Sequence, residues 1–89
     1  MRAVVTVIGK DKVGIISKVS EALAENNVNI LDITQTIMKD IFTMVMMIDI
    51  TESKIKFTDL VDKLSAVGDE IGLEIRCQHE EIFNSMHKI

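Results

Sequence analysis

The most constraining feature of this sequence is that its hydrophobic pattern alternates between the period of a strand and the period of a helix. Residues 3–8 are mostly apolar and β-branched, as in a buried strand, whereas residues 14–26 repeat apolar side chains at the spacing of one helix face. Residues 29–38 and 41–50 return to strand character on either side of the turn signal Lys39-Asp40. This arrangement predicts a strand, a helix and then a hairpin.

The second half of the chain repeats the alternation. Residues 57–71 carry a second apolar stripe at helical spacing, and Gly72 follows as a C-cap. Residues 73–79 then alternate strictly between apolar and polar side chains, which is typical of a half-exposed strand. The order βαββαβ with right-handed crossovers predicts an α+β, ferredoxin-like fold. In this fold a four-stranded antiparallel sheet, in the order 4-1-3-2, carries both helices on one face.

Two helices cover only one face of such a sheet, and the predicted central strands are apolar on both faces. A monomer rarely leaves an aliphatic face of this kind in water. Residues 80–89 offer a cover, because their apolar side chains fall at the spacing of a short amphipathic helix: Ile82, Phe83, Met86 and Ile89. We therefore predict a C-terminal helix that docks on its own sheet or on a partner's, and a homo-oligomer, most simply a dimer. The alternative is a monomer whose tail covers its own sheet.

Size and charge exclude several classes of protein. A chain of 89 residues with a net charge of −4 is expected to form a single domain over residues 1–89, too small for a cleft enzyme. Its acidity disfavours nucleic acid and membrane surfaces as partners, because both attract Lys and Arg. It also has no apolar run long enough to span a bilayer. The single Cys77 cannot form an internal disulfide, so a reducing, cytoplasmic setting is expected.

Catalytic and metal-binding patterns are weak throughout the sequence. No nucleophile stands beside a base, so we expect no enzyme activity. Cys77 and His79 share one face of a strand and, with His87, make an alternative metal set, but their spacing matches no zinc motif. We therefore expect no metal and no other cofactor. A small enzyme of the same topology, such as an acylphosphatase, would need an arginine in a phosphate-cradling loop, which Arg2 and Arg76 do not provide.

The segment that joins the first strand to the first helix is the one locally basic part of the chain. Residues 1–13 carry three basic side chains and one acidic side chain, whereas residues 14–75 carry five basic and 11 acidic ones. The N-terminus of the following helix offers free backbone N–H groups and a positive dipole end. The phosphate-loop pattern is absent, so the expected guest is a small carboxylate. The alternative is a tight turn with solvated lysines.

The residues of this loop also resemble those of a known family. The run from Val7 to Ile16, followed by Val28-Asn29-Ile30, is similar to the opening of ACT domains, small βαββαβ modules that sense amino acids and regulate metabolic enzymes. The usual Asp-x-Pro-Gly of that family is matched here with Val13 in place of the proline. The C-terminal run 75–89 resembles the ending of stand-alone bacterial ACT proteins of unassigned function.

The resemblance implies a ligand site shared between two chains. In ACT domains that bind amino acids, the positions matching Asp11 and Asn29 contact the ligand, and the position of Gly14 lets it approach the backbone. A helix of about 13 residues separates the two contacts by roughly 20 Å. One small ligand therefore reaches both only if two chains pack their first helices antiparallel. The expected site residues are Lys10, Asp11, Lys12, Val13, Gly14, Ile15, Asn29 and Ile30.

Asp11 departs from the family pattern, since some members carry asparagine at this loop position. An ionised carboxylate only accepts hydrogen bonds, so Asp11 favours the ligand's ammonium group and leaves the ligand's carboxylate to Lys10, Lys12 or backbone N–H groups. The predicted function is a regulatory module that binds an amino acid or a similar small molecule between two protomers and modulates a metabolic enzyme. The alternative is an interaction module of the same fold that binds no ligand.

Overall fold

The structure is a computed structural model, and it describes residues 1–86. Within these residues the chain forms a four-stranded sheet and three helices. In chain order the elements are β1 (Arg2–Lys10), α1 (Ile15–Glu25), β2 (Asn29–Met38), β3 (Ile41–Asp49), α2 (Phe57–Ile71), β4 (Glu74–His79) and α3 (Glu80–Met86).

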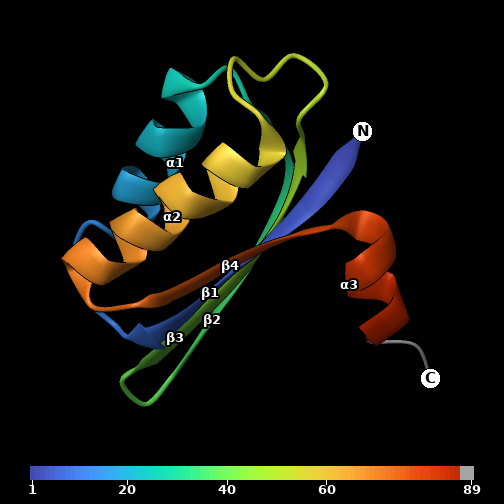
Figure 1. Ribbon diagram of the computed structural model, residues 1–89. Coiled ribbons are helices and arrows are strands. Elements are labelled where there is room, and N and C mark those ends of the chain that lie inside the picture. Colours follow the sequence, from blue (N-terminus) through green and yellow to red (C-terminus); the bar gives the residue numbers. More distant parts are fainter. Residues whose placement is uncertain (87–89) are drawn as a thin grey trace.

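The sheet is antiparallel at every junction, in the order β2-β3-β1-β4. This confirms the predicted ferredoxin-like topology, with β1 and β3 in the centre and β2 and β4 at the edges. Helices α1 and α2 lie side by side on one face of the sheet, whereas α3 lies on the opposite side (Figure 1). The predicted hairpin turn at Lys39-Asp40 joins β2 to β3.

The main core lies between the sheet and the helices α1 and α2. Alternate residues of the central strands point into it, so Val5 and Val7 of β1 and Met44 of β3 have no exposed surface. Leu23 of α1 and Leu60 of α2 are also fully buried and meet these strands. Each such side chain contributes about 1.5–3 kcal/mol of transfer free energy. Aliphatic burial on the helix-covered face is thus the principal source of stability.

The N-terminal end of α1 is set by backbone conformation, whereas at the C-terminal end the buried Asn26 side chain donates to the carbonyl oxygen of Ala22 at 2.9 Å. Gly14 precedes the helix with φ 93° and accepts the N–H of Lys18, and no described side chain caps this end. The start of the helix is therefore a backbone turn, and Asp11 does not cap it. At the other end Asn27 takes φ 59°, the left-handed conformation that asparagine tolerates. Helix α2 ends as predicted, with Gly72 at φ 73°.

Helix α3 provides the cover that the second face of the sheet requires. It follows β4 without an intervening loop and packs on its own β1 and β4. Phe83 lies over the sheet between two small hollows, one bordered by Val4 and Met47 and the other by Thr6 and Ile8. Val4 is only 2% exposed, although it points away from α1 and α2. The tail therefore docks in cis as far as Met86; the expected apolar contact of Ile89 lies outside the described residues.

None of the helices within residues 1–86 combines the length and the apolar character needed to cross a membrane.

Candidate functional site

A hollow of about 350 Å³ lies at the N-terminal end of α1. The β1–α1 loop, the first turn of α1 and the middle of the β2–β3 hairpin form its walls. Its lining residues are Asp11, Lys12, Gly14, Ile15, Ile16, Ser17, Gln35, Ile37 and Phe42. The loop is fixed against the hairpin, because the backbone N–H of Asp11 donates to the carbonyl oxygen of Asp40 at 2.7 Å. The hollow is therefore built from three segments that the fold holds together.

The backbone groups at the start of α1 favour a small anion in this hollow. The first turn of α1 leaves backbone N–H groups without intrahelical partners, and it contains no acidic side chain that would compete for them. Gly14 has open space where a side chain would begin, with nothing within 4 Å, and its positive φ disfavours any residue with a Cβ. A carboxylate can thus approach the end of the helix directly.

The sequence-predicted loop residues divide into those that line the hollow and those that do not. Asp11, Lys12, Gly14 and Ile15 line it, although the Lys12 ammonium donates to the carbonyl oxygen of Ile71 at 2.6 Å. That bond places the charge of Lys12 at the C-terminal end of α2, where the helix dipole favours a cation.

Two loop residues lie outside the hollow. Val13 is fully exposed, at 103% of its reference surface, and Lys10 is exposed at the end of β1. Neither residue is among those that line the hollow.

The bond from Lys12 to Ile71 gives the first prediction. Replacing Lys12 by methionine keeps most of the side-chain volume but removes the ammonium, so we expect the free energy of unfolding to fall by about 1 kcal/mol. The matched control is Lys10→Met, which removes the same charge from the exposed end of β1, two residues away, without breaking a bond to α2. Urea denaturation of both variants measures the difference, and equal losses would show that the Lys12 bond does not stabilise the fold.

Asn29 and Ile30 lie at the opposite end of α1. Asn29 lines a second hollow, of about 390 Å³, with Asn27, Val28 and residues around them. Ile30 is partly buried and packs against the main core, so it supports the site without facing it. Helix α1 has 11 residues and spans about 16 Å. A single chain therefore does not bring Asp11 and Asn29 to one small ligand.

Sequence reasoning missed the part of the first hollow that the hairpin supplies. Gln35 and Ile37 are 20 residues or more beyond the loop, and nothing local marks them as neighbours of Asp11. The only available signal is the strand alternation, which places Gln35 and Ile37 on the helix-covered side of β2. Ile16 lies next to the buried Ile15 in the first turn of α1, but it is 39% exposed and lines the hollow.

An exposed apolar strip borders the first hollow along β2 and α1. Ile33 pairs with Met46 and Ile37 pairs with Phe42, so both isoleucines point to the helix-covered side of the sheet. Their β3 partners are buried, but Ile33 is 41% exposed and Ile37 is 53% exposed. Leu31 of β2 and Ile16 of α1 add further exposed apolar surface. This set, named the β2–α1 strip, consists of Ile16, Leu31, Ile33 and Ile37.

The alternative metal set and a cysteine nucleophile find little support. Cys77 is buried in the core, and desolvation raises the pKa of its thiol to about 11, so the thiol is protonated at neutral pH. No group of three or more metal-ligating side chains gathers anywhere in residues 1–86. His87, the third member of the alternative metal set, lies outside the described residues.

The comparisons with known proteins show the family of this chain. A family model described as the ACT domain matches residues 2–78. The chain belongs to the ACT domain family. It is 50% identical to a UPF0237 protein of Methanocaldococcus jannaschii over 99% of this chain and 98% of that one. It is 53% identical to a UPF0237 protein of Listeria innocua over the full length of both chains.

Solved structures show the same relationship. An ACT domain protein from Streptococcus pneumoniae superposes with a TM-score of 0.81 and 40% identity, covering 93% of each chain. The regulatory subunit of aspartate kinase from Thermus thermophilus superposes with a TM-score of 0.66 and 28% identity, over 86% of this chain and 50% of that one. This ACT domain therefore has a regulatory protein among its structural neighbours.

Proposed function

We propose that this protein is a non-catalytic, cytoplasmic regulatory ACT module that binds an amino acid or a similar small ligand at a homodimer interface and modulates a metabolic partner. The observation that carries the proposal is the hollow at the N-terminal end of α1, which is open to an anion and bordered by an apolar strip. The regulatory subunit of aspartate kinase, a structural neighbour, supports the same reading.

The β2–α1 strip supports a two-fold dimer. Strand β2 is an edge strand, and an edge strand with exposed apolar side chains favours pairing with another chain. In a two-fold arrangement the same surface serves both protomers, and with the axis perpendicular to α1 the two α1 helices run antiparallel. The N-terminal end of α1 in one protomer then lies near the C-terminal end of α1 in its mate. The two hollows at the ends of α1 thus become the halves of two equivalent sites.

In such a site each polar group of an amino acid has a partner. The first-turn N–H groups of α1 serve the carboxylate, and Asp11 accepts from the ammonium. Ile15 and Ile37 provide an apolar wall for the ligand's side chain. Asn29 of the second protomer then closes the site with an amide that both donates and accepts hydrogen bonds.

A thermal-shift screen against the proteinogenic amino acids tests the proposal, with calorimetry on any that respond. At 100-fold excess over the dissociation constant, a ligand specific for the folded state adds about 2.7 kcal/mol to the free energy of unfolding. No shift with any amino acid at millimolar concentration would contradict ligand binding. If the dimer persisted under those conditions, the second candidate would be favoured: an interaction module that uses the β2–α1 strip without a ligand.

The variant Asn29→Ala tests the contribution of the second protomer. We expect it to weaken ligand binding about tenfold, because it removes a hydrogen-bonding amide from the interface while leaving the core intact. The matched control is Thr36→Ala, an exposed polar residue of the same strand that lines neither hollow. Titration calorimetry measures both affinities, and an unchanged affinity in Asn29→Ala would remove Asn29 from the site.

A further inference from the structure

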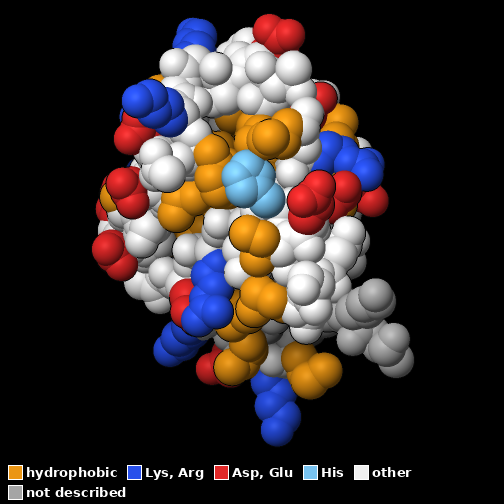
Figure 2. Space-filling view, turned by 45° about the vertical axis from the view of Figure 1, so that its right-hand side comes forward, with side chains coloured by type: hydrophobic (Ala, Val, Ile, Leu, Met, Phe, Trp, Pro, Cys, Tyr) orange, Lys and Arg blue, Asp and Glu red, His pale blue; other side chains and the backbone are white. Residues whose placement is uncertain are grey.

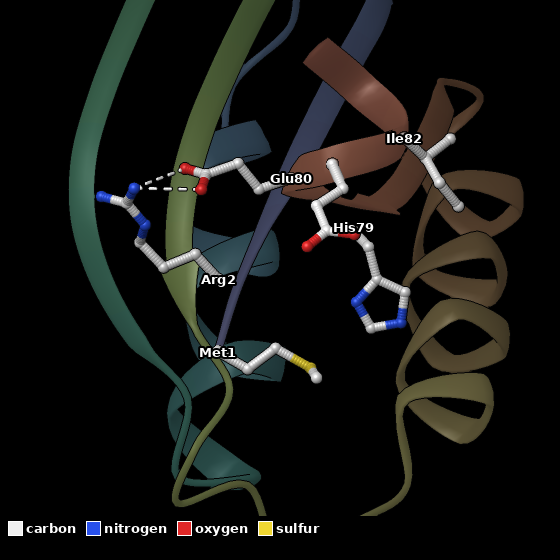
Figure 3. Close-up of a pocket in the computed structure, with 6 residues that line it drawn as sticks. Met1, Arg2, His79, Glu80 and Ile82 are labelled. Atoms are coloured by element: carbon white, nitrogen blue, oxygen red, sulfur yellow. Dashed lines mark hydrogen bonds and ion pairs between the residues drawn. The ribbon is translucent and has the colours of Figure 1, made fainter. Parts of the chain in front are cut away.

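A second kind of hollow, of about 600 Å³, lies away from α1. It forms where the start of β1, the end of β4 and the start of α3 meet, and its lining residues are Met1, Arg2, His79, Glu80, Glu81 and Ile82 (Figure 3). None of these residues belongs to the site proposed above. Its volume falls within the range of small-molecule pockets.

The walls on the helix-covered side of the sheet are apolar and aromatic. His79 pairs with the buried Ala3, so its ring lies on that side, where it stacks on Phe57 with ring centroids 3.9 Å apart. Figure 2 shows the histidine, in pale blue, with orange hydrophobic side chains above it, to its left and below it, and red acidic side chains to its right. Met1 and Ile82, at 71% and 52% exposed, stand at the same hollow. The stacked pair and the two exposed apolar side chains make a platform for an apolar or aromatic body.

Most charges around the hollow are already balanced. Arg2 and Glu80 form an ion pair at 2.9 Å, on the other side of β1 from the His79 ring in Figure 3. The terminal ammonium donates to the side chain of Thr51 at 2.7 Å and lies 3.7 Å from Asp49. Hydrogen bonds from Thr51, with a contribution from the terminal ammonium, lower the pKa of Asp49 and keep that carboxylate ionised.

Glu81 is the remaining charge. Among residues 1–86 it has no ion-pair or hydrogen-bond partner, so the hollow keeps an unmatched carboxylate beside its apolar platform. A cation in the hollow therefore gains an attraction that no anion gains. The acidic balance of the whole chain, a net charge of −4, acts in the same direction.

We propose that this hollow is a second binding site, for a small primary amine that carries an aromatic or branched apolar body. The body packs on His79, Met1 and Ile82, and the ammonium pairs with Glu81. A ligand without a carboxylate suits this site, because Arg2 is occupied by Glu80. The site is thereby chemically distinct from the hollow at the N-terminus of α1, which favours an anion.

Binding here acts on α3. Glu80, Glu81 and Ile82 are the first three residues of that helix, while Met1, Arg2 and His79 belong to the β1 and β4 ends. Helix α3 has seven residues, none of them fully buried, so its docked state depends on few contacts. A ligand that touches both the strand ends and the helix stabilises α3 on the sheet. Amide hydrogens of α3 should consequently exchange more slowly when the amine is bound.

The test is an NMR titration of the full chain with 2-phenylethylamine, compared with 3-phenylpropionate, which has a similar body and the opposite charge. We expect the amine to shift the amide signals of His79, Glu81 and Ile82, and the acid to leave them in place. Glu81→Gln keeps the side-chain size and should weaken amine binding about fivefold, as for an exposed ion pair. Glu21→Gln, on the exposed face of α1, is the matched control.

Three results would overturn this second site. The first is equal binding of the amine and the acid, and the second is unchanged amine affinity in Glu81→Gln. The third is amine-induced shifts confined to the first turn of α1. Because 2-phenylethylamine has no carboxylate, its failure to bind would not contradict the proposed amino-acid site at α1. Conversely, a lack of amino-acid binding at α1 would not contradict the amine site. Slower exchange at α3 with bound amine, together with the charge preference, would establish both the site and its effect.

Discussion

Replacing Ile33 by glutamate is expected to convert the proposed dimer into a monomer at micromolar concentration. Ile33 lies in the middle of the β2–α1 strip, at 41% exposed, and a two-fold dimer of the proposed kind would present it twice to the interface. Burying one isoleucine side chain stabilises an interface by about 1.5–3 kcal/mol, so the loss of two such side chains destabilises it by about 3–6 kcal/mol. The two glutamates also face each other across an apolar surface, where their charges lose hydration and repel. The dissociation constant should rise at least about 100-fold.

A control variant on the same strand separates dimerisation from folding. Thr36→Glu introduces the same charge on β2, three residues away, but Thr36 pairs with Thr43 and points to the opposite face. Both positions are exposed, so both variants should keep the monomer fold, as circular dichroism would show. Light scattering should give a monomer mass for Ile33→Glu and a dimer mass for Thr36→Glu. A dimer in both variants would exclude the β2–α1 strip as the interface.

The same pair of variants links assembly to ligand binding. If each site is completed by the partner's Asn29, a monomer holds only half of it. Thermal stabilisation by the amino-acid ligand should then disappear in Ile33→Glu and persist in Thr36→Glu. Retained stabilisation in a monomeric Ile33→Glu would place the whole ligand site within one chain, at the N-terminal end of α1.

The sequence predicts the fold well because its strongest signals are local and periodic. The bounds of β2, at Asn29–Met38, and of α2, at Phe57–Ile71, agree with the predicted ranges to the residue. Both segments are delimited by residues with a clear backbone role: the Lys39-Asp40 turn and Gly72 at φ 73°. The strand order follows from the same patterns, because strands that are apolar on both faces belong in the centre of a sheet.

The sequence predicts the candidate site less well because its contacts join distant segments. The Lys12 ammonium meets a carbonyl 59 residues later, and Arg2 meets Glu80 across 78 residues. A lysine in a glycine-flanked loop indicates anion binding from its local setting alone. Only the packed structure shows that its charge is already engaged with α2. The hollow at His79 could not be predicted for the same reason, since its lining residues come from the two ends of the described chain.

Replacing Gly68 by valine is expected to have the largest effect on stability. An added Cβ at Gly68 would lie 2.6 Å from the carbonyl oxygen of Leu73 and 3.1 Å from a side-chain carbon of Ile75. The carbonyl is backbone, so it cannot rotate away as a side chain does. A hydrogen bond also holds the two segments together, because the Leu73 N–H donates to the Gly68 carbonyl oxygen at 2.8 Å. The steric clash is therefore relieved only if α2 and β4 separate.

The size of the loss follows from two opposing terms. Replacing a glycine within a helix improves the helix propensity by up to about 1 kcal/mol. Overpacking a tight contact costs about 1–3 kcal/mol, and valine adds two methyl groups to the clash that the Cβ already makes. We expect a net loss of at least about 2 kcal/mol, and a midpoint of thermal unfolding lower by at least about 8 °C. Ala66→Val, on the exposed face of the same helix, is the matched control and should cost only about 0.5 kcal/mol.

The Gly68 variant also bears on the site, because the C-terminal end of α2 holds the Lys12 ammonium through Ile71. If α2 moves away from β4, that anchor moves with it, and the β1–α1 loop loses its tie to the second helix. Gly68→Val should therefore weaken binding of any ligand at the N-terminus of α1, even at temperatures where the variant is fully folded. A variant that lost stability but bound the ligand with unchanged affinity would show that the loop is positioned by the Asp11–Asp40 backbone bond alone.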